Sequence, residues 1–168
     1  ILSIMRVISG AISHMVIGIT TWKNSHFSHK AALSALPVIG WRPDVIHCHD
    51  WQTGLIPVYL KGRFGEGEFF RGIKSVMTIH NLKFQGVWDV KTIQRFSGLP
   101  DYFFTPDKLE AYKDGNMLKG GLVYADAITT VSNTYAEEIK TPFYGEGLDG
   151  LIAGEIRRSP WDCKRYRL

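Results

Sequence analysis

Residues 42–51 read Arg42-Pro43-Asp44-Val45-Ile46-His47-Cys48-His49-Asp50-Trp51. The adjacent β-branched residues Val45 and Ile46 predict a short buried strand over Asp44–His47. The run from Trp51 to Lys61 has the apolar content of a helix that follows this strand. The stretch therefore predicts a strand that turns abruptly into a helix, which is the repeating unit of α/β folds.

Polar and aromatic groups stand at the predicted end of this strand. In an open α/β sheet, ligands bind at the carboxyl ends of the strands, where the chain turns into a helix. His49, Asp50 and Trp51 fall at such an end, and all three can contact a polyhydroxylated ligand. The alternative is that His49 and Asp50 only cap the start of the helix, since Asp is a favoured N-cap residue.

The same arrangement recurs twice further along the chain. A second strand is predicted over Lys74–Ile79 and runs into His80 and Asn81, and a third over Ala127–Val131 runs into Ser132, a natural N-cap. Helices are predicted between and after these strands, over Trp51–Lys61, Val90–Phe96 and Asn116–Tyr124. Alternating strands and helices at this spacing predict an α/β fold. We expect a Rossmann-like parallel sheet with right-handed connections and helices on both faces.

Five motifs in this order resemble the N-terminal domain of bacterial glycogen synthases and plant starch synthases. They are Pro43-Asp44-Val45-Ile46-His47 with His49-Asp50-Trp51; Thr78-Ile79-His80-Asn81 with Phe84-Gln85-Gly86; Asn116-Met117-Leu118-Lys119-Gly120-Gly121-Leu122; Ala125-Asp126 with Thr130-Val131-Ser132; and the loop from Thr141-Pro142 to Gly145-Glu146-Gly147-Leu148-Asp149-Gly150-Leu151. The resemblance covers about His29 to Leu151. It implies the N-terminal half of a retaining glucosyltransferase of the GT-B architecture, which is incomplete without a second Rossmann-like domain.

The resemblance also implies a reaction and its partners. Such enzymes transfer glucose from ADP-glucose to the non-reducing end of an α-1,4-glucan such as glycogen, with retention at the anomeric carbon. No cofactor and no metal are implied, because cations of the missing C-terminal domain carry the diphosphate of the donor. The isolated chain is therefore expected to be inactive. The alternatives are a non-catalytic α-glucan-binding domain or a pseudogene relic.

The site residues follow from matching the motifs. The resemblance implies catalytic roles for His80, beside the reacting carbon of the donor sugar, and for Asp50, at the cleft. The expected substrate-binding residues are Trp51, His49, Asn81, Gln85, Gly86 and Asn116. Each has a structural alternative: Asp50 as a helix cap, Trp51 as plain core packing, and His80 as an ordinary structural histidine.

Other motif residues carry weaker expectations. Lys119 is expected to be a solvated surface lysine rather than a cleft residue, and Gly120-Gly121 to permit tight helix packing rather than to bind phosphate. His47 and His49 share a face of the predicted strand, but no third ligand follows at a spacing suited to a metal. A nucleotide-binding Rossmann module is disfavoured, because no G-x-G-x-x-G follows a strand.

Composition narrows the class of protein further. The 168 residues are enough for one domain, and 45% are hydrophobic and 21% charged, which is ordinary for a globular protein. The formal charge is +4, yet residues 29–151 hold 13 Lys and Arg against 14 Asp and Glu, so the surplus lies in the flanks. This disfavours a nucleic-acid partner, which needs a basic stripe on the folded body.

We expect no membrane segment and no cleavable signal. Two cysteines predict a cytoplasmic protein, with Cys48 as a small buried residue.

Both ends depart from the family pattern where strong motifs are expected. One allowed codon choice for residues 159–168, read in another frame, encodes L-R-G-I-V-N-G-I-D, which resembles the missing family motif; a similar shift over residues 16–27 encodes Y-R-D-Y-N-M-E-K-F-T-F. We therefore expect residues 1–27 and 152–168 to be non-native, out-of-frame segments with little packed structure, around a domain over 28–151. A sheet without its first strand would expose an unpaired edge.

Overall fold

The computed structural model describes residues 2–9, 12–19 and 25–158, and the side chains of residues 29–154. Its main sheet has the strand order β1-β2-β3-β4-β8. The three predicted strands are confirmed as β3 (Val45–His49), β4 (Lys74–Ile79) and β8 (Ala127–Thr130), and they pair in parallel. β3 continues two residues beyond the predicted end, because Cys48 and His49 pair with Met77 and Thr78 of β4.

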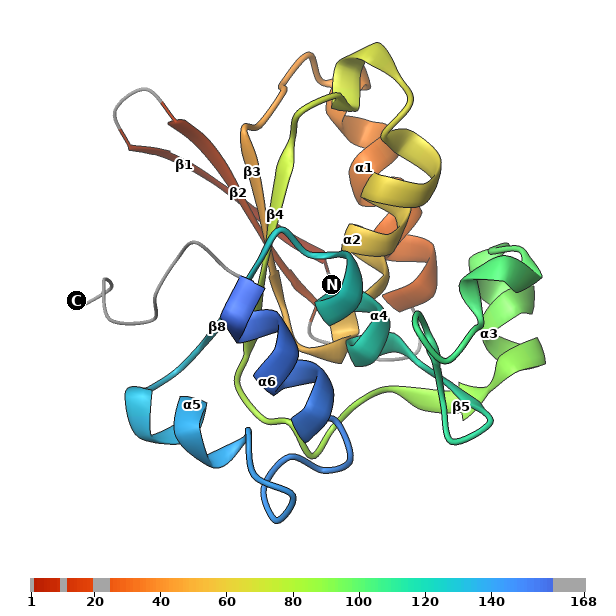
Figure 1. Ribbon diagram of the computed structural model, residues 1–168. Helices are drawn as coiled ribbons and strands as arrows, with labels where there is room; N and C mark the ends of the chain where they lie inside the picture. Colours follow the sequence, from red (N-terminus) through yellow and green to blue (C-terminus); the bar gives the residue numbers. More distant parts are fainter. Residues whose placement is uncertain (1, 10–11, 20–24, 159–168) are drawn as a thin grey trace.

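Residues 2–9 and 12–19 differ from the expectation of little packed structure. They form β1 (Leu2–Ser9) and β2 (Ile12–Ile19), an antiparallel pair, and β2 lies parallel to β3 (Figure 1). The expected unpaired edge beside β3 is therefore occupied. The physical reason is that a free sheet edge offers a row of backbone donors and acceptors, which an Ile- and Val-rich segment can pair with whatever its origin.

The chain end also differs in part. Helix α6 (Asp149–Arg158) continues past Leu151, and Ile152 is fully buried, so the first residues of the expected tail are helical and packed. Residues 159–168 lie outside the described residues. Whether either segment is translated out of frame stays a prediction.

The helices between the parallel strands lie on one side of the sheet. These are α1 (Ser25–Val38), α2 (Leu55–Tyr59) and α4 (Met117–Tyr124) (Figure 1). The strands β2, β3, β4 and β8 follow one another in a single direction, so right-handed connections place every helix on the same face. Over β3 and β4 of the described chain, the expected second helical layer is not found: Ile46 and Cys48 are fully buried, whereas His47 and His49 on the other face are only half-buried.

The predicted helix over Trp51–Lys61 is built from three short pieces. They are the 3₁₀ turn η2 (Trp51–Thr53), α2, and the π-helical turn η3 (Leu60–Phe64). Pro57 has no N–H to donate to the carbonyl of Thr53, which disfavours an uninterrupted α-helix from Trp51.

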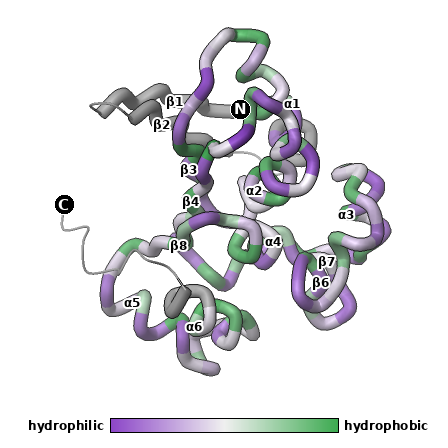
Figure 2. Tube along the Cα trace, turned by 45° about the horizontal axis from the view of Figure 1, so that its top comes forward, coloured by the Kyte–Doolittle hydropathy of each residue, from purple (hydrophilic) through white to green (hydrophobic). Residues whose placement is uncertain are grey.

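The remaining elements surround this layer. They are η4 (Glu68–Phe70), β5 (Val87–Asp89), α3 (Val90–Ser97), η5 (Asp101–Phe103), β6 (Glu110–Ala111), β7 (Asp114–Asn116) and α5 (Asn133–Glu138). β5, β7 and β6 form a small antiparallel sheet. Figure 2 shows hydrophilic and hydrophobic residues alternating along the peripheral helices α3 and α5, as expected for helices with one exposed side. No helix in the described part of the chain is both long and apolar enough to span a membrane.

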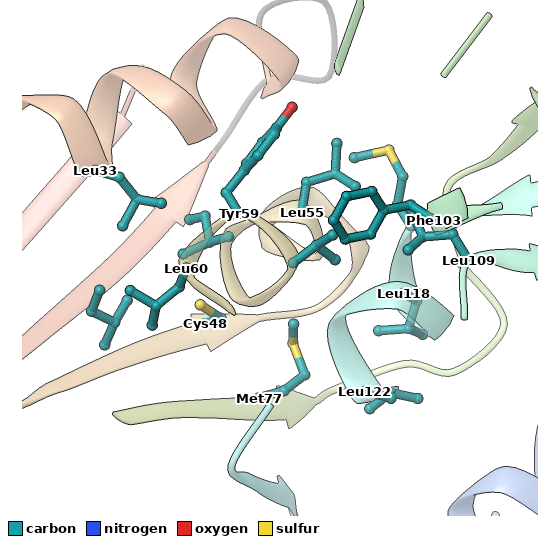
Figure 3. Packing of buried hydrophobic residues seen from close by; sticks show 14 of the residues in the cluster. Leu33, Cys48, Leu55, Tyr59, Leu60, Met77, Phe103, Leu109, Leu118 and Leu122 are labelled. Carbon is teal, nitrogen blue, oxygen red and sulfur yellow. The ribbon is translucent and has the colours of Figure 1, made fainter. Parts of the chain in front are cut away.

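The core centres on α2, whose five residues are all buried. Figure 3 shows side chains from α1, β3, β4 and α4 gathered around it. Two glycines allow α4 to approach this closely: a Cβ on Gly121 would lie 2.4 Å from Cε of Met77, and one on Gly54 would lie 2.2 Å from the carbonyl oxygen of Met117. The expected packing role of Gly121 is confirmed, and Cys48 is fully buried as predicted.

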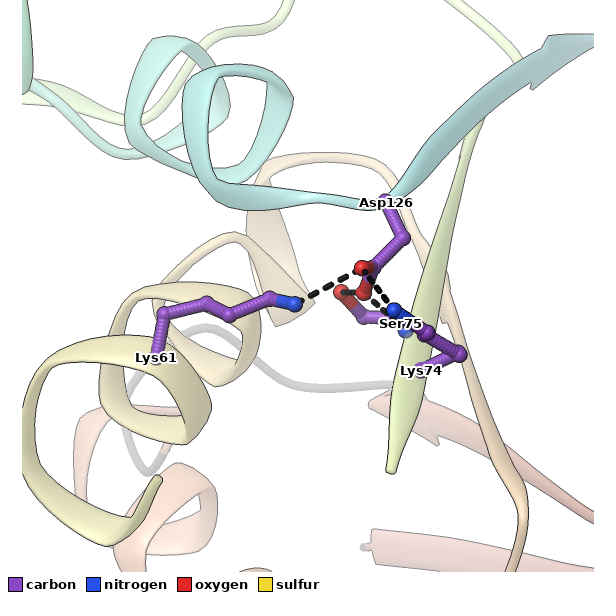
Figure 4. A network of polar contacts seen from close by, with 4 residues as sticks. All are labelled: Lys61, Lys74, Ser75 and Asp126. Atoms are coloured by element: carbon purple, nitrogen blue, oxygen red, sulfur yellow. Dashed lines mark hydrogen bonds and ion pairs between the residues drawn. The ribbon is translucent and has the colours of Figure 1, made fainter. Parts of the chain in front are cut away.

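A polar cluster closes the amino end of the sheet, opposite the candidate site. Asp126 accepts from Nζ of Lys61 at 2.7 Å and Nζ of Lys74 at 3.3 Å, and from the backbone N–H of Ser75 at 2.8 Å (Figure 4). Burial alone raises the pKa of Asp126, but the hydrogen bonds from Lys61 and Ser75 outweigh it and hold the pKa below its usual value. The cluster joins η3, β4 and β8 and leaves the carboxyl ends of the strands free for other groups.

Candidate functional site

Two imidazole rings meet where β3 and β4 end. His49 is the last residue of β3, and His80 directly follows the last residue of β4. Nδ1 of His49 lies 3.0 Å from Nε2 of His80, so one ring nitrogen donates to the other. Burial, and then the neighbouring His80, lower the pKa of His49, while the charge of Asp50 opposes them. The pair therefore favours a neutral His49 that orients the ring of His80.

Asp50 ties the two strand ends together. Its Oδ1 accepts the backbone N–H of His80 at 2.7 Å and that of Asn81 at 3.3 Å, and its own N–H donates to the carbonyl of Thr78 at 3.0 Å. The helix-cap alternative is wrong, because its side chain makes no capping hydrogen bond to η2. Asp50 has φ = 54°, which is uncommon for a residue with a Cβ. This backbone turns the carboxylate across to β4 rather than along its own helix.

Trp51 supports the loop that carries His80. A Cβ on Gly86 would lie 2.6 Å from Cε3 of Trp51, so the loop passes directly over the indole ring. Gly86 also has φ = 64°, a conformation that glycine adopts without strain. The ring centroid of Trp88 lies 5.5 Å from that of Trp51. Trp51 is half-buried, so packing is part of its role.

Gln85 and Asn116 fasten the other end of the loop. Nδ2 of Asn116 donates to Oε1 of Gln85 at 2.6 Å, and Nε2 of Gln85 donates to the carbonyls of Leu82 at 3.2 Å and Glu146 at 3.0 Å. Oδ1 of Asn116 accepts the N–H of Lys119 and caps α4. Asn116 is 1% exposed, which places it behind the loop rather than on its ligand-facing side.

Tyr135 is a residue that the sequence reasoning missed. Its hydroxyl oxygen accepts the backbone N–H of Leu82 at 2.9 Å and holds the middle of the His80–Gly86 loop. The available signal was its place in α5: Ser132 caps that helix by accepting the N–H of Tyr135, so Tyr135 lies in the first turn after β8, at the same sheet edge. The Ser132 cap itself is as predicted.

Lys119, His47 and His49 do not form a separate ligand site. Nζ of Lys119 donates to the carbonyls of Pro106 and Glu110, so its side chain supports the β6 region rather than reaching the cleft or remaining free in solvent. Nε2 of His47 pairs with Oγ1 of Thr78 at 2.6 Å. Among the side chains that the structure describes, no three His, Cys, Asp or Glu groups are arranged to hold a metal ion.

The predicted site residues thus meet at one rim of the sheet. His49, Asp50, His80 and Asn81 lie together, Trp51 and Gly86 pack against each other, and Gln85 and Asn116 hold the loop by hydrogen bonds. Such a rim presents imidazole and amide groups held in fixed positions, which suits orientation of hydroxyl groups and stabilisation of developing charge. Asp50 Oδ1 already accepts two backbone N–H groups, which makes this carboxylate a weak nucleophile.

Comparisons with known proteins show which family the chain is similar to. A model of the family described as starch synthase catalytic domain matches residues 20–154. The glycogen synthase of Lachnospira eligens is 75% identical over 126 residues, which cover 75% of this chain and 26% of that protein. That of Lachnoclostridium phytofermentans is 64% identical over 137 residues, covering 82% and 28%.

A solved structure is similar in fold as well. The catalytic domain of starch synthase IV from Arabidopsis thaliana, bound to ADP and acarbose, superposes with a TM-score of 0.73 at 28% identity. The match covers 84% of this chain and 30% of that one. The chain therefore spans roughly a quarter to a third of the relatives that it matches.

Proposed function

Since the chain belongs to the starch synthase catalytic domain family, we propose that it supplies the N-terminal, glucan-facing part of a cytoplasmic glycogen synthase. The complete enzyme transfers glucose from ADP-glucose to the non-reducing end of an α-1,4-glucan such as glycogen, with retention at the anomeric carbon. The observation that carries the proposal is the position of His80, held at the strand rim by Asp50 and His49 within motifs shared with the family.

His80 is the proposed catalytic residue. Its imidazole stands beside the anomeric carbon of the donor sugar and stabilises the charge that develops there. The neutral, half-buried His49 fixes its orientation through the 3.0 Å contact. A preorganised dipole or charge at such a position contributes about 10²–10³ in rate.

Asp50 and its neighbours bind and position the sugars. Asp50 keeps one carboxylate oxygen, Oδ2, for sugar hydroxyls, while Oδ1 holds the backbone of His80 and Asn81. Asn81 and the exposed side of Trp51 contribute an amide and an aromatic face to the same rim. Gln85, Gly86 and Asn116 act by shaping the loop. With Asp50 occupied in this way, same-face attack by the acceptor through an oxocarbenium-like state accounts for retention better than a covalent intermediate.

The donor diphosphate is bound outside this chain. The Arabidopsis neighbour is bound to ADP and acarbose, a nucleotide and an oligosaccharide, which supports a nucleotide-sugar donor and a glucan acceptor for this family member. We propose that a second domain supplies the cations for the diphosphate and completes the donor site. No metal or other cofactor is proposed.

A chimeric enzyme tests the proposal. Residues 29–151 replace the matching segment of the Lachnospira eligens glycogen synthase, which 75% identity makes compatible in packing. We expect incorporation of labelled glucose from ADP-glucose into glycogen, and a fall in kcat of at least about 100-fold for His80→Ala. Lys91→Ala, an exposed position on α3, is the control and should leave the rate unchanged. A folded chimera whose kcat is insensitive to His80→Ala would contradict the proposed role.

A further inference from the structure

The backbone around His80 is held from both of the strands that flank β4. On the β3 side, Oδ1 of Asp50 accepts the N–H groups of His80 and Asn81. On the β8 side, Oγ1 of Thr130 donates to the carbonyl of Ile79, the residue before His80, at 2.7 Å. The chain therefore leaves β4 between hydrogen bonds that come from two different neighbouring strands.

A second contact from the β8 side reaches the chain two residues after His80. Oη of Tyr135 accepts the backbone N–H of Leu82 at 2.9 Å. The backbone N–H of Tyr135 donates to Oγ of Ser132, and the ring packs against the hydrophobic core. Tyr135 is thus fixed at its backbone and along its ring, so its hydroxyl is a firm attachment point for the loop.

The segment around Leu82 has little freedom to find another acceptor. The side chain of Leu82 is fully buried. The next N–H groups are already used within a turn: that of Lys83 donates to Oδ1 of Asn81 at 3.1 Å, and that of Phe84 donates to the carbonyl of Asn81 at 3.3 Å. An N–H that loses its acceptor in a partly buried position is costly, so the loop would shift to recover a partner.

A shift of this loop changes the position of His80. The imidazole of His80 is held by the 3.0 Å contact with Nδ1 of His49, which requires the backbone of His80 to keep its direction. A misplacement of a reacting or catalytic group by about 1 Å can lower a rate about 100-fold. The hydroxyl of Tyr135 therefore bears on the rate of the reaction through His80, without any contact of its own with a sugar.

We infer that Tyr135 is a positioning residue for His80, and that its hydroxyl, together with Asp50, sets the direction in which the imidazole is presented. The inference rests on the proposed function for the catalytic role of His80. It assigns to helix α5 a part in the chemistry at the end of β4. Loss of the hydroxyl should lower kcat and leave substrate binding unchanged.

Amide hydrogen exchange of the 168-residue chain, followed by NMR, tests the positioning. Tyr135→Phe removes one oxygen atom and keeps the ring, so we expect the amide of Leu82 to exchange at least about tenfold faster and the ring signals of His80 to shift. Tyr59→Phe is the matched control, because the hydroxyl of Tyr59 also bonds to a backbone group, the carbonyl of Ser97 at 2.8 Å, but between α2 and α3. A change that only destabilises the fold would speed the exchange of Leu82 equally in both variants.

The chimera measures the effect on the reaction. We expect Tyr135→Phe to lower kcat about tenfold, with the KM values for ADP-glucose and glycogen unchanged, and Tyr59→Phe to change none of the three. If Tyr135 acts through His80, Tyr135→Phe should have no further effect on kcat in a chimera that already carries His80→Ala. A general structural role would lower kcat by the same factor with or without the imidazole.

Three results would overturn the inference: equal exchange of Leu82 in Tyr135→Phe and Tyr59→Phe, an unchanged kcat in the Tyr135→Phe chimera, or the same loss of kcat with and without the imidazole of His80. An active chimera that is sensitive to His80→Ala but not to Tyr135→Phe would reject the positioning role alone. An inactive folded chimera would reject the proposed function, and the exchange measurement would still decide whether Tyr135 holds the loop.

Discussion

Oδ1 of Asp50 accepts backbone N–H groups from both His80 and Asn81. This single atom therefore holds the chain where it leaves β4. Asp50 makes these contacts with φ = 54° and without a capping hydrogen bond to η2. At the scale of one residue, Asp50 is therefore a positioning group as well as a sugar ligand.

Substitutions of Asp50 should separate these roles. Asp50→Ala leaves two N–H groups without their acceptor and places alanine at a positive φ. We therefore expect the free energy of unfolding to fall by about 1–3 kcal/mol. Asp50→Asn keeps an acceptor for these N–H groups, so it should cost clearly less. Urea denaturation measures both, and equal losses for the two variants would contradict the positioning role.

The His49–His80 contact predicts a pH dependence of stability. The pKa of His49 is lowered in the folded chain, so the folded state holds fewer protons than the unfolded state, whose His titrates near 6.5. Its contribution is complete above the unfolded pKa and is lost as the pH falls from there through the folded pKa. The thermal unfolding midpoint should therefore drop as the pH falls below about 6.5, and by less in His49→Gln. A variant with the same pH profile as the wild type would show that His49 does not carry the effect.

The contact between η2, α2 and α4 depends on glycine. Gly54 has ordinary helical angles, so its backbone conformation does not require glycine. Glycine is required because a Cβ at this position would lie only 2.2 Å from the carbonyl oxygen of Met117. A backbone carbonyl cannot rotate away as a side chain can. The close approach of α4 to Gly54 keeps the capping residue Asn116 near enough to donate to Gln85.

Gly54→Ala should therefore destabilise the chain by about 1–3 kcal/mol through overpacking. Gly150→Ala is the control, because a Cβ there meets nothing within 4 Å in helix α6. That change should be neutral or stabilising by up to about 1 kcal/mol, from helix propensity alone. Chemical denaturation of both variants decides the matter, and a harmless Gly54→Ala would mean that α4 can move outward freely.

On the scale of the whole molecule, the face of β3 that carries His47 and His49 is only half-buried. The chain matches about a quarter of the length of the glycogen synthases to which it is similar. Catalysis of the proposed type needs donor and acceptor held together, with the diphosphate charge offset by cations.

We therefore expect the isolated chain to lack glucosyltransferase activity. Labelled glucose from ADP-glucose should not be incorporated into glycogen by the purified chain, while weak glucan binding persists through Trp51 and the His80–Gly86 loop. The chimera serves as the positive control under the same conditions. Clear turnover by the chain that disappears in His80→Ala would show that this part is sufficient for catalysis.

The sequence by itself determined the parallel strands, the packing role of Gly121, the Ser132 cap and the meeting of His49, Asp50 and His80 at one rim. Each follows from a local pattern together with the rule that parallel strands end at the same edge of a sheet. The reasoning was wrong for residues 2–9 and 12–19. Because a family motif is absent there, we expected little structure, yet this segment can pair with an open edge of the sheet.

Only the tertiary structure decided which atoms of these residues meet. The left-handed turn of Asp50, the Leu82 contact of Tyr135, the place of Asn116 behind the loop and the helices on one face of β3 and β4 all depend on which element lies beside which. Sequence periodicity indicates which face of a segment is buried. It does not indicate which other segment covers that face. Contacts between segments distant along the chain are settled by packing and strand order, which exist only once the chain has folded.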